Sequence, residues 1–378
     1  MAGSTYGNVF RIMTWGESHG KGVGVTIDGC PAGLALCEED IQKYLDRRKP
    51  GQSRYATARK EGDQVEILSG VFEGKTTGTP IAMMVKNTDQ RSHDYSAIMD
   101  VYRPGHADYC FDEKYGFRDY RGGGRSSARE TIARVAAGAA ACKLLEHFGI
   151  TVTAYVKSIG PFEIDPRRFD LKERDKNPLN MPDAVAAEET EEFLQRMMEV
   201  RDSAGGVVEC LVDGMPAGIG EPVFDKLDAS LARAVMSIGA VKGFEIGDGF
   251  EAAKALGSEN NDEFYTDEDG QVKKKTNHAG GILGGISDGS QIVLRAAFKP
   301  TPSISRMQRT VNRSGENVEI SIHGRHDPVV VPRAVVVVEA MAALTVMDML
   351  LVSMSSRLDM IQLFFQVENV EGADIEEN

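Results

Sequence analysis

The sequence predicts an α+β fold that forms one continuous domain. Segments typical of strands and of helices follow one another without the regular alternation that builds a parallel sheet. The chain has no Pro- or Ser-rich linker and no segment that repeats at a fixed period. Its 378 residues fit one large domain, so we expect a domain over residues 1–366 and an acidic, disordered tail over residues 367–378.

The N-terminal part should contain short strands and one amphipathic helix. We expect strands over residues 9–14, 22–27, 65–71 and 80–85, and the helix over residues 38–48. Ile41, Tyr44 and Leu45 share one face of that helix, and acidic residues occupy its first turn, where they complement the helix dipole.

A long helix is predicted from about Ala128 to Phe148. Ser127 and Glu130 have the spacing of a capping box, and Gly149 stands where a C-terminal cap is expected. The many alanines of this segment suit close packing against other elements.

The rest of the chain also contains both predicted strands and predicted helices. We expect strands over residues 152–159, 207–212, 291–298 and 318–322, and helices over residues 188–201, 225–237 and 332–357. The polar segment 258–277 is predicted to be an exposed, mobile loop or a hairpin. The most apolar stretch, 329–352, contains Arg333, Glu339 and Asp348, which favours a buried helix over a membrane span.

Composition limits the partners. The net charge of −14 should repel nucleic acid and anionic membranes. The five cysteines are odd in number and lack CxxC spacing, which is typical of reduced thiols, and the N-terminus lacks a signal-peptide pattern. We therefore expect a cytoplasmic protein.

Basic residues nevertheless gather in two segments. Residues 47–60 contain six basic residues and no acid, and residues 118–134 contain five arginines against two acids. Local positive charge on an acidic chain indicates a cleft for a small anion, although solvated surface arginines remain the alternative.

Two histidines lie in turns rich in glycine. One is His19 within Gly16–Gly20, and the other is His106 within Arg103–Asp108. Histidine transfers protons near neutral pH, so the pair favours acid–base chemistry, while a turn histidine without a role would explain either one alone.

The segment Arg121–Glu130 is a glycine-rich loop that leads into the long helix. Free backbone N–H groups and the helix dipole prepare such a place for an anion, and Arg125 and Arg129 add charged donors. It lacks the Lys of a Walker A loop and the spacing of a dinucleotide fingerprint. An ordinary capped helix is the alternative.

Three later segments also have residues that could bind a ligand. The Gly pairs of His278–Ser287 suit close approach of a flat ring or of another strand, and Lys299–Ile304 offers phosphate donors on a turn stiffened by proline. In Gly324–Pro328, Arg325 and Asp327 would share one side of an extended segment. No metal-ligand cluster, nucleophile elbow or catalytic Cys pair accompanies them, so the residues indicate a phosphorylated, carboxylated small substrate without naming the reaction.

The motif set resembles one family. The segments GESHG, GRSSARET and GRHDP, spread in this order over about 310 residues, are similar to the three signatures of chorismate synthases. DRRKPGQSRY, DYSAI, RPGHAD, HAGGILGGIS and KPTPSI are also similar to that family. The resemblance covers nearly the whole chain, from Gly3 to about Asp348.

The resemblance implies a lyase reaction of the shikimate pathway, which supplies the aromatic amino acids. 5-Enolpyruvylshikimate 3-phosphate would lose phosphate and a ring hydrogen in an anti-1,4-elimination that gives chorismate. Reduced FMN would be required without net redox change, because it lends electron density to the substrate transiently. The resemblance also implies NADP as a linked cofactor, a homotetramer, and helices sandwiched between antiparallel sheets. No extra flavin-reductase domain is apparent in the sequence, so we expect an external flavin reductant.

Roles follow residue by residue from the resemblance. His19 would protonate the departing phosphate, His106 would tune the protonation of the flavin, and Asp327 would assist proton removal through the flavin. The residues that would bind the substrate's phosphate and carboxylates are Arg48, Arg54, Arg129 and Arg325. The residues that would contact FMN are Arg125, Ser126, Ser127, Gly239, Ala240, Gly284, Lys299, Thr301, Ser303 and Arg325.

Two positions depart from the family pattern. Gly239 replaces a more common Asn, and Pro302 replaces a more usual Ser, which puts their FMN contacts in doubt. Two other classes of function are weighed against the lyase. An FMN oxidoreductase would change the flavin's redox state stoichiometrically, and a binder of RNA or phosphate-rich ligands is disfavoured by the net charge and by the lack of aromatic residues interleaved with the arginines.

Overall fold

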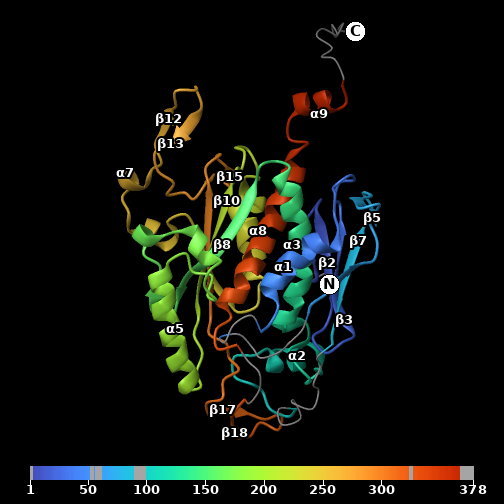
Figure 1. Cartoon of the computed structure of the whole chain (residues 1–378), viewed down its shortest axis with the longest axis vertical. Helices are drawn as coiled ribbons and strands as arrows, with labels where there is room; N and C mark the ends of the chain where they lie inside the picture. Colours follow the sequence, from blue (N-terminus) through green and yellow to red (C-terminus); the bar gives the residue numbers. More distant parts are fainter. Residues whose placement is uncertain (1–2, 52–54, 56–61, 89–98, 323–326, 367–378) are drawn as a thin grey trace, which may run out of the picture.

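The computed structural model describes residues 3–51, 55, 62–88, 99–322 and 327–366. Over these residues, helices lie between two five-stranded antiparallel sheets (Figure 1). The predicted α+β class and the sandwich implied by the resemblance are confirmed. Arg54, Arg325 and the predicted tail, 367–378, lie outside the described residues.

The first sheet uses the N-terminal part of the chain. Its spatial order is β1 (Thr5–Tyr6), β2 (Arg11–Gly16), β3 (Gly22–Asp28), β7 (Ile81–Lys86) and β4 (Val65–Ile67). Apolar side chains of β3 such as Val25 and Ile27 have no exposed area, because the helical layer covers them.

The second sheet uses the rest of the chain. Its order is β11 (Val241–Ile246), β16 (Ile292–Phe298), β10 (Gly206–Asp213), β8 (Thr151–Ile159) and β9 (Phe162–Glu163). In β16 every second residue is buried, starting at Ile292, so one face of this sheet forms core. The buried residues of both sheets join one hydrophobic cluster.

Four helices fill the space between the sheets: α1 (Glu38–Arg48), α3 (Thr131–Glu146), α6 (Leu227–Met236) and α8 (Val331–Ser353). Here α1 and α3 pack against strands of the first sheet, and α6 and α8 pack against strands of the second (Figure 1). The two long helices touch closely, since a Cβ atom on Gly138 would lie 2.3 Å from that of Ala340. The alanine-rich sequence of α3 makes this approach possible.

Helix α8 is long and apolar enough to cross a membrane by length and composition. However, 83% of its most apolar window is buried inside the structure, as in the core helix of a soluble protein. Its burial agrees with the sequence prediction.

The remaining elements surround the sandwich. They are the helices α2 (Asp108–Tyr115), α4 (Leu171–Arg174), α5 (Ala184–Glu199), α7 (Gly257–Asn260) and α9 (Leu358–Phe364), and the strand pairs β5 (Val71–Phe72) with β6 (Lys75–Thr76), β12 (Phe264–Thr266) with β13 (Val272–Lys274), β14 (Ile282–Leu283) with β15 (Ile286–Ser287), and β17 (Gln308–Val311) with β18 (Asn317–Ile320).

Segment 258–277 contains a hairpin, one of the two predicted alternatives. Lys274 anchors it, with Nζ 3.2 Å from Asp262 Oδ2 and 2.7 Å from Asp288 Oδ2. None of the residues from 258 to 277 lines the pocket described below.

Two local predictions were wrong. The expected strand 65–71 is two strands, β4 and β5, because Gly70 turns the chain with φ +82° beside Ile81. The long helix begins as a 3₁₀ turn over Ala128–Glu130, and there is no capping box. Ser127 Oγ accepts from the N–H of Arg129 at 3.3 Å, while the Glu130 carboxylate binds Thr14 Oγ1 at 3.0 Å.

Candidate active site

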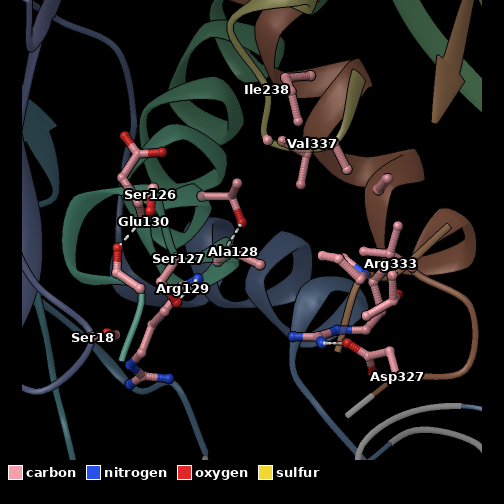
Figure 2. A pocket seen from close by; sticks show the side chains of 18 of the residues that line it. Ser18, Ser126, Ser127, Ala128, Arg129, Glu130, Ile238, Asp327, Arg333 and Val337 are labelled. Atoms are coloured by element: carbon pink, nitrogen blue, oxygen red, sulfur yellow. Dashed lines mark hydrogen bonds and ion pairs between the residues drawn. The ribbon is translucent and has the colours of Figure 1, made fainter. Parts of the chain in front are cut away.

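A pocket of about 550 Å³ lies where α3 and α8 begin and where α1 and α6 end. The positive ends of two helix dipoles therefore meet at this pocket, which suits an anionic ligand. Figure 2 shows Ser126–Glu130 on one side of it and Asp327 with Arg333 on the other, with Ile238 and Val337 between and above them. Its volume is in the usual range for small-molecule sites.

The pocket unites most of the residues that the sequence predicted for the site. Those that line it are His19, Arg48, His106, Arg125, Ser126, Ser127, Arg129, Gly239, Ala240, Lys299, Thr301, Ser303 and Asp327. Arg54 and Arg325 lie outside the described residues. Gly284 does not line the pocket.

His19 lies in the turn that joins β2 to β3. Ser18 Oγ is 3.2 Å from its Nδ1, and Gly122 packs so closely that a Cβ there would come within 2.5 Å of the same nitrogen. Asn87 fastens the turn from the other side, since its side-chain amide donates to the carbonyl oxygens of Glu17 at 2.9 Å and Gly20 at 2.8 Å. The imidazole is thus held at the pocket wall by short-range packing.

His106 is held through both ring nitrogens. Its Nδ1 is 3.1 Å from the Pro104 carbonyl oxygen, and its Nε2 is 2.8 Å from Ser303 Oγ. A carbonyl only accepts, so the neutral ring carries its proton on Nδ1 and accepts from Ser303. Burial, followed by the positive charge of Arg103, lowers the pKa of His106 below its ordinary value, which favours the neutral ring.

Arg48 and Arg129, two of the predicted substrate-binding residues, share the carboxylate of Asp63, which does not itself line the pocket. Asp63 Oδ2 is 2.9 Å from Arg48 Nη1, and Asp63 Oδ1 is 3.0 Å from Arg129 Nη1. Burial, with Arg333 nearby, lowers the pKa of Arg48 to about 10. Burial also raises the pKa of Asp63, and the charge of Arg48 opposes that rise. The sequence analysis did not single out Asp63.

Asp327 pairs with Arg333, whose Nη1 lies 2.6 Å from Asp327 Oδ2 (Figure 2). Arg333 also donates through Nε to the backbone carbonyl of Arg48 at 3.2 Å. This arginine was noted in the sequence only as a charge within an apolar stretch. An arginine near the start of a mostly apolar helix was the available signal.

In the glycine-rich loop, the side chains of Arg125 and Ser126 form hydrogen bonds within the protein. Arg125 reaches back to the first sheet, with Nη2 2.6 Å from Thr14 Oγ1 and Nη1 3.1 Å from the carbonyl of Gly16. Ser126 donates to the carbonyl of Gly123 at 2.7 Å. Both residues still line the pocket, beside the N-terminal end of α3.

The turn after β16 faces the loop that carries His106. Lys299 Nζ donates to the carbonyl of Gly105 at 2.7 Å. A Cβ on Gly105 would lie 2.8 Å from Cβ of Pro302, so the proline fills the space against that loop. Thr301 Oγ1 is buried at the pocket without a hydrogen-bond partner among the described residues.

Two further predicted flavin contacts differ in their surroundings. Ala240 lines the pocket in a left-handed backbone conformation, with φ +73°, a strained state for a residue with a Cβ that is often found at functional sites. Gly284 and Gly285 form the two-residue turn between β14 and β15, both with positive φ. In this chain the glycine pairs of segment 278–287 therefore serve turns and close backbone contacts.

Comparison with known proteins agrees with these features. The family model described as "Chorismate synthase" matches residues 10–351. The chain belongs to the chorismate synthase family.

Relatives with that name share most of their sequence with this chain. The chorismate synthase of Lachnospira eligens is 66% identical over 366 residues, which are 97% of this chain and 100% of that protein. The chorismate synthase of Methanosarcina mazei is 57% identical over 354 residues, 93% of this chain and 97% of that protein. A solved structure titled "Crystal Structure of Chorismate Synthase" is 34% identical, has a TM-score of 0.75, and covers 95% of this chain and 97% of its own.

Chorismate synthases use reduced flavin, and the pocket residues fit such a group. Thr301 Oγ1 is a buried hydroxyl that has no hydrogen-bond partner within the described part of the chain, and the N-terminal ends of α3 and α8 suit the flavin's phosphate. Among the described residues, no group of three or more His, Cys, Asp or Glu side chains is placed to hold a metal ion.

Proposed function

We propose that this protein converts 5-enolpyruvylshikimate 3-phosphate to chorismate by anti-1,4-elimination of phosphate, with reduced FMN bound in the pocket and no net redox change. The observation that supports this most is that one pocket at two helix N-termini unites His19, His106, Arg129 and the Lys299–Ser303 turn. Each matches a motif that carried the family resemblance.

The arginine side of the pocket would bind the substrate's anionic groups. Arg48 and Arg129 contribute two positive charges against the one carboxylate of Asp63, and the dipole of α3 adds to the same field. His19, at the same side, would protonate the departing phosphate. Its turn is fixed by Asn87, so the imidazole needs little rearrangement to act.

The other side would hold the flavin. The side chains of Lys299, Thr301 and Ser303 and the backbone around Ala240 would bind it from that side, and Arg125, Ser126 and Ser127 would contact it from the arginine side. We also propose contacts to Gly239, Gly284 and Arg325. Bound there, reduced FMN would supply the transient electron density that the carbon–oxygen bond cleavage requires.

Two residues of this chain would manage protons there. His106, kept neutral by burial and by Arg103, would set the protonation of the group beside it. The carboxylate of Asp327, oriented by Arg333, would accept or orient the proton that leaves the substrate ring.

We also propose a homotetramer in the cytoplasm, supplied with reduced flavin by an external, NADP-linked reductant. The five cysteines, all among the described residues, are free, which suits a reducing compartment. We further propose that residues 1–366 form one catalytic domain.

An anaerobic assay tests the activity. Purified protein should release phosphate from 5-enolpyruvylshikimate 3-phosphate only with reduced FMN, and the flavin should stay reduced after many turnovers. Equal phosphate release without flavin, or with oxidised flavin and no reductant, would contradict the proposed activity. Stoichiometric flavin oxidation would favour the FMN oxidoreductase instead.

A further inference from the structure

Asp63 stands behind the arginine side of the pocket and does not line it. Its side chain has no exposed area, and the side chains of Arg48 and Arg129 keep only 3% and 8% of theirs. One carboxylate oxygen contacts each guanidinium, at 2.9 Å for Arg48 and 3.0 Å for Arg129. A single buried anion therefore joins two residues from separate helical segments.

Both arginines also donate to neutral groups. Arg48 donates to Thr131 Oγ1 at 3.1 Å and to the carbonyl of Ala128 at 2.9 Å. Arg129 donates to the side-chain oxygen of Asn87 and, at 3.5 Å, to the carbonyl of Lys86. In the ion pairs that the structure describes for these two guanidinium groups, Asp63 is the shared anion.

The backbone at Asp63 shows that this placement is held against a local cost. Its φ is +45°, in the left-handed region that side-chain-bearing residues avoid, although Asp and Asn enter it more readily than most. Such strain persists only where surrounding contacts fix the residue. The two charged hydrogen bonds are contacts of that kind.

Charge balance adds a second consequence. The carboxylate of Asp63 offsets positive charge of the two guanidinium groups in a region that solvent hardly reaches. Without the carboxylate, two buried cations would repel each other and could settle in more than one arrangement. With it, the donors of both arginines keep one geometry relative to each other.

We propose that Asp63 is a positioning residue of the anion site: it fixes Arg48 and Arg129 relative to each other so that both can engage one anionic substrate. This role rests on the proposed function of the pocket. It differs from a merely structural role in predicting a loss of substrate binding that is separate from any loss of folding.

Asp63→Asn tests the proposal, because Asn keeps the shape and tolerates positive φ but lacks the charge. Its amide oxygen can accept from one guanidinium, while its NH₂ would face the donors of the other. We expect the dissociation constant of 5-enolpyruvylshikimate 3-phosphate, measured by calorimetry with oxidised FMN so that turnover is absent, to rise at least about tenfold. FMN affinity should change less than about twofold.

The direction of the change is diagnostic. Removing a carboxylate adds positive charge, which by itself would tighten the binding of an anion. Weakened binding therefore supports positioning. Tightened binding would show that Asp63 only screens charge, and unchanged binding would show that it only stabilises the fold; either result overturns the proposal.

Asp262→Asn is the matched control. Asp262 is also a buried partner of a buried cation, Lys274, with both side chains 2% exposed, but it lies outside the pocket lining. The Asp262→Asn substitution should lower the melting temperature and leave substrate binding unchanged. Asp63→Glu keeps the charge but moves the carboxylate by one methylene group, so it should weaken substrate binding without affecting FMN. The melting temperatures of both variants, compared with that of Asp262→Asn, separate the change in binding from any loss of folding.

The same measurements separate this proposal from the proposed function. If the unaltered chain binds the substrate but releases no phosphate with reduced FMN, the elimination fails while the positioning role is judged by binding alone. If the unaltered chain turns over and Asp63→Asn and Asp63→Glu bind substrate like it, only the positioning role fails.

Discussion

The two sides of the pocket satisfy their polar groups in different ways. On the arginine side, the guanidinium groups of Arg48 and Arg129 are hydrogen-bonded to protein partners at Asp63, Thr131 and Asn87. On the side formed by Lys299–Ser303, the buried hydroxyl of Thr301 has no partner among the described residues. The two guanidinium groups are thus bound within the protein, whereas the hydroxyl of Thr301 is a group that a ligand would satisfy.

The difference indicates how each side would bind. A prearranged cationic site loses little conformational entropy when an anion arrives, which suits a substrate that must be held in one reactive geometry. An unsatisfied hydroxyl gains a hydrogen bond only when a ligand fills the site, which suits a cofactor. Each side also holds one histidine, His19 near Asn87 and His106 near Ser303.

The largest effects should come from removing either histidine. His19→Ala and His106→Ala should each reduce turnover by about 10²-fold or more, the usual contribution of a positioned proton donor or acceptor. Single-turnover phosphate release measures this directly. Circular dichroism should show that both variants fold.

Near-normal turnover in one variant would remove the chemical role from that side of the pocket. The two-sided arrangement of acid–base groups would then be wrong, and that histidine would be a turn residue only.

Asp327→Asn should have the next largest effect, about tenfold to 10²-fold on turnover. The amide keeps the shape and can still accept from Arg333, but it cannot take a proton. Dissociation constants for substrate and FMN should change little, the pattern of an interaction made mainly in the transition state. If binding weakens and saturated turnover survives, Asp327 merely holds Arg333 in place.

Arg48→Ala tests the arginine side by binding alone. We expect it to weaken substrate binding about tenfold and FMN binding much less, as judged by titration of each ligand. It should also destabilise the fold by about 3–5 kcal/mol, because Asp63 would lose a buried partner. Arg48→Lys keeps the charge and serves as the control for that loss, and preferential loss of FMN affinity would reverse the assignment of the two sides.

The sequence singled out those pocket residues that belong to local patterns. His19, His106 and Ser303 lie in turns whose Gly and Pro content was visible, and the loop before α3, which lines the pocket, was predicted to bind an anion from its glycines and arginines. Helix α1 was predicted with its observed bounds because its apolar period and acidic first turn agree. Such features depend on neighbours in the chain.

Residues that act across the fold were not predicted. Asp63 is 15 positions from Arg48 and 66 from Arg129, and nothing near it in sequence reports either contact. The capping box failed partly for the same reason, since the tertiary partner Thr14, together with Arg134 one turn further along the helix, attracts the carboxylate of Glu130. Long-range ion pairs form only after packing brings the elements together, so a local pattern does not contain them.

The smallest effect concerns the charge around His106. The positive charge of Lys299 is one of the causes that lower the pKa of His106, after burial and Arg103. Lys299→Gln removes that charge and disfavours the imidazolium less, so the pKa of His106 should move up, toward its ordinary value of about 6.5. Because the neutral ring is the active form in the proposed mechanism, the acidic limb of kcat/KM should move to higher pH.

The lowered pKa of His106 also affects how the stability of the folded state depends on pH. A histidine whose folded pKa is lowered binds fewer protons than in the unfolded chain, so its contribution to stability falls as pH drops from its ordinary pKa toward the folded one. Lys299→Gln should reduce that fall. Proton NMR of His106 across pH 5–8 measures the shift, and we expect kcat/KM near pH 6 to change less than about tenfold. Lys275→Gln removes an exposed lysine outside the pocket and is the control; a downward shift, or an equal shift in the control, would show that Lys299 does not act on His106 through its charge.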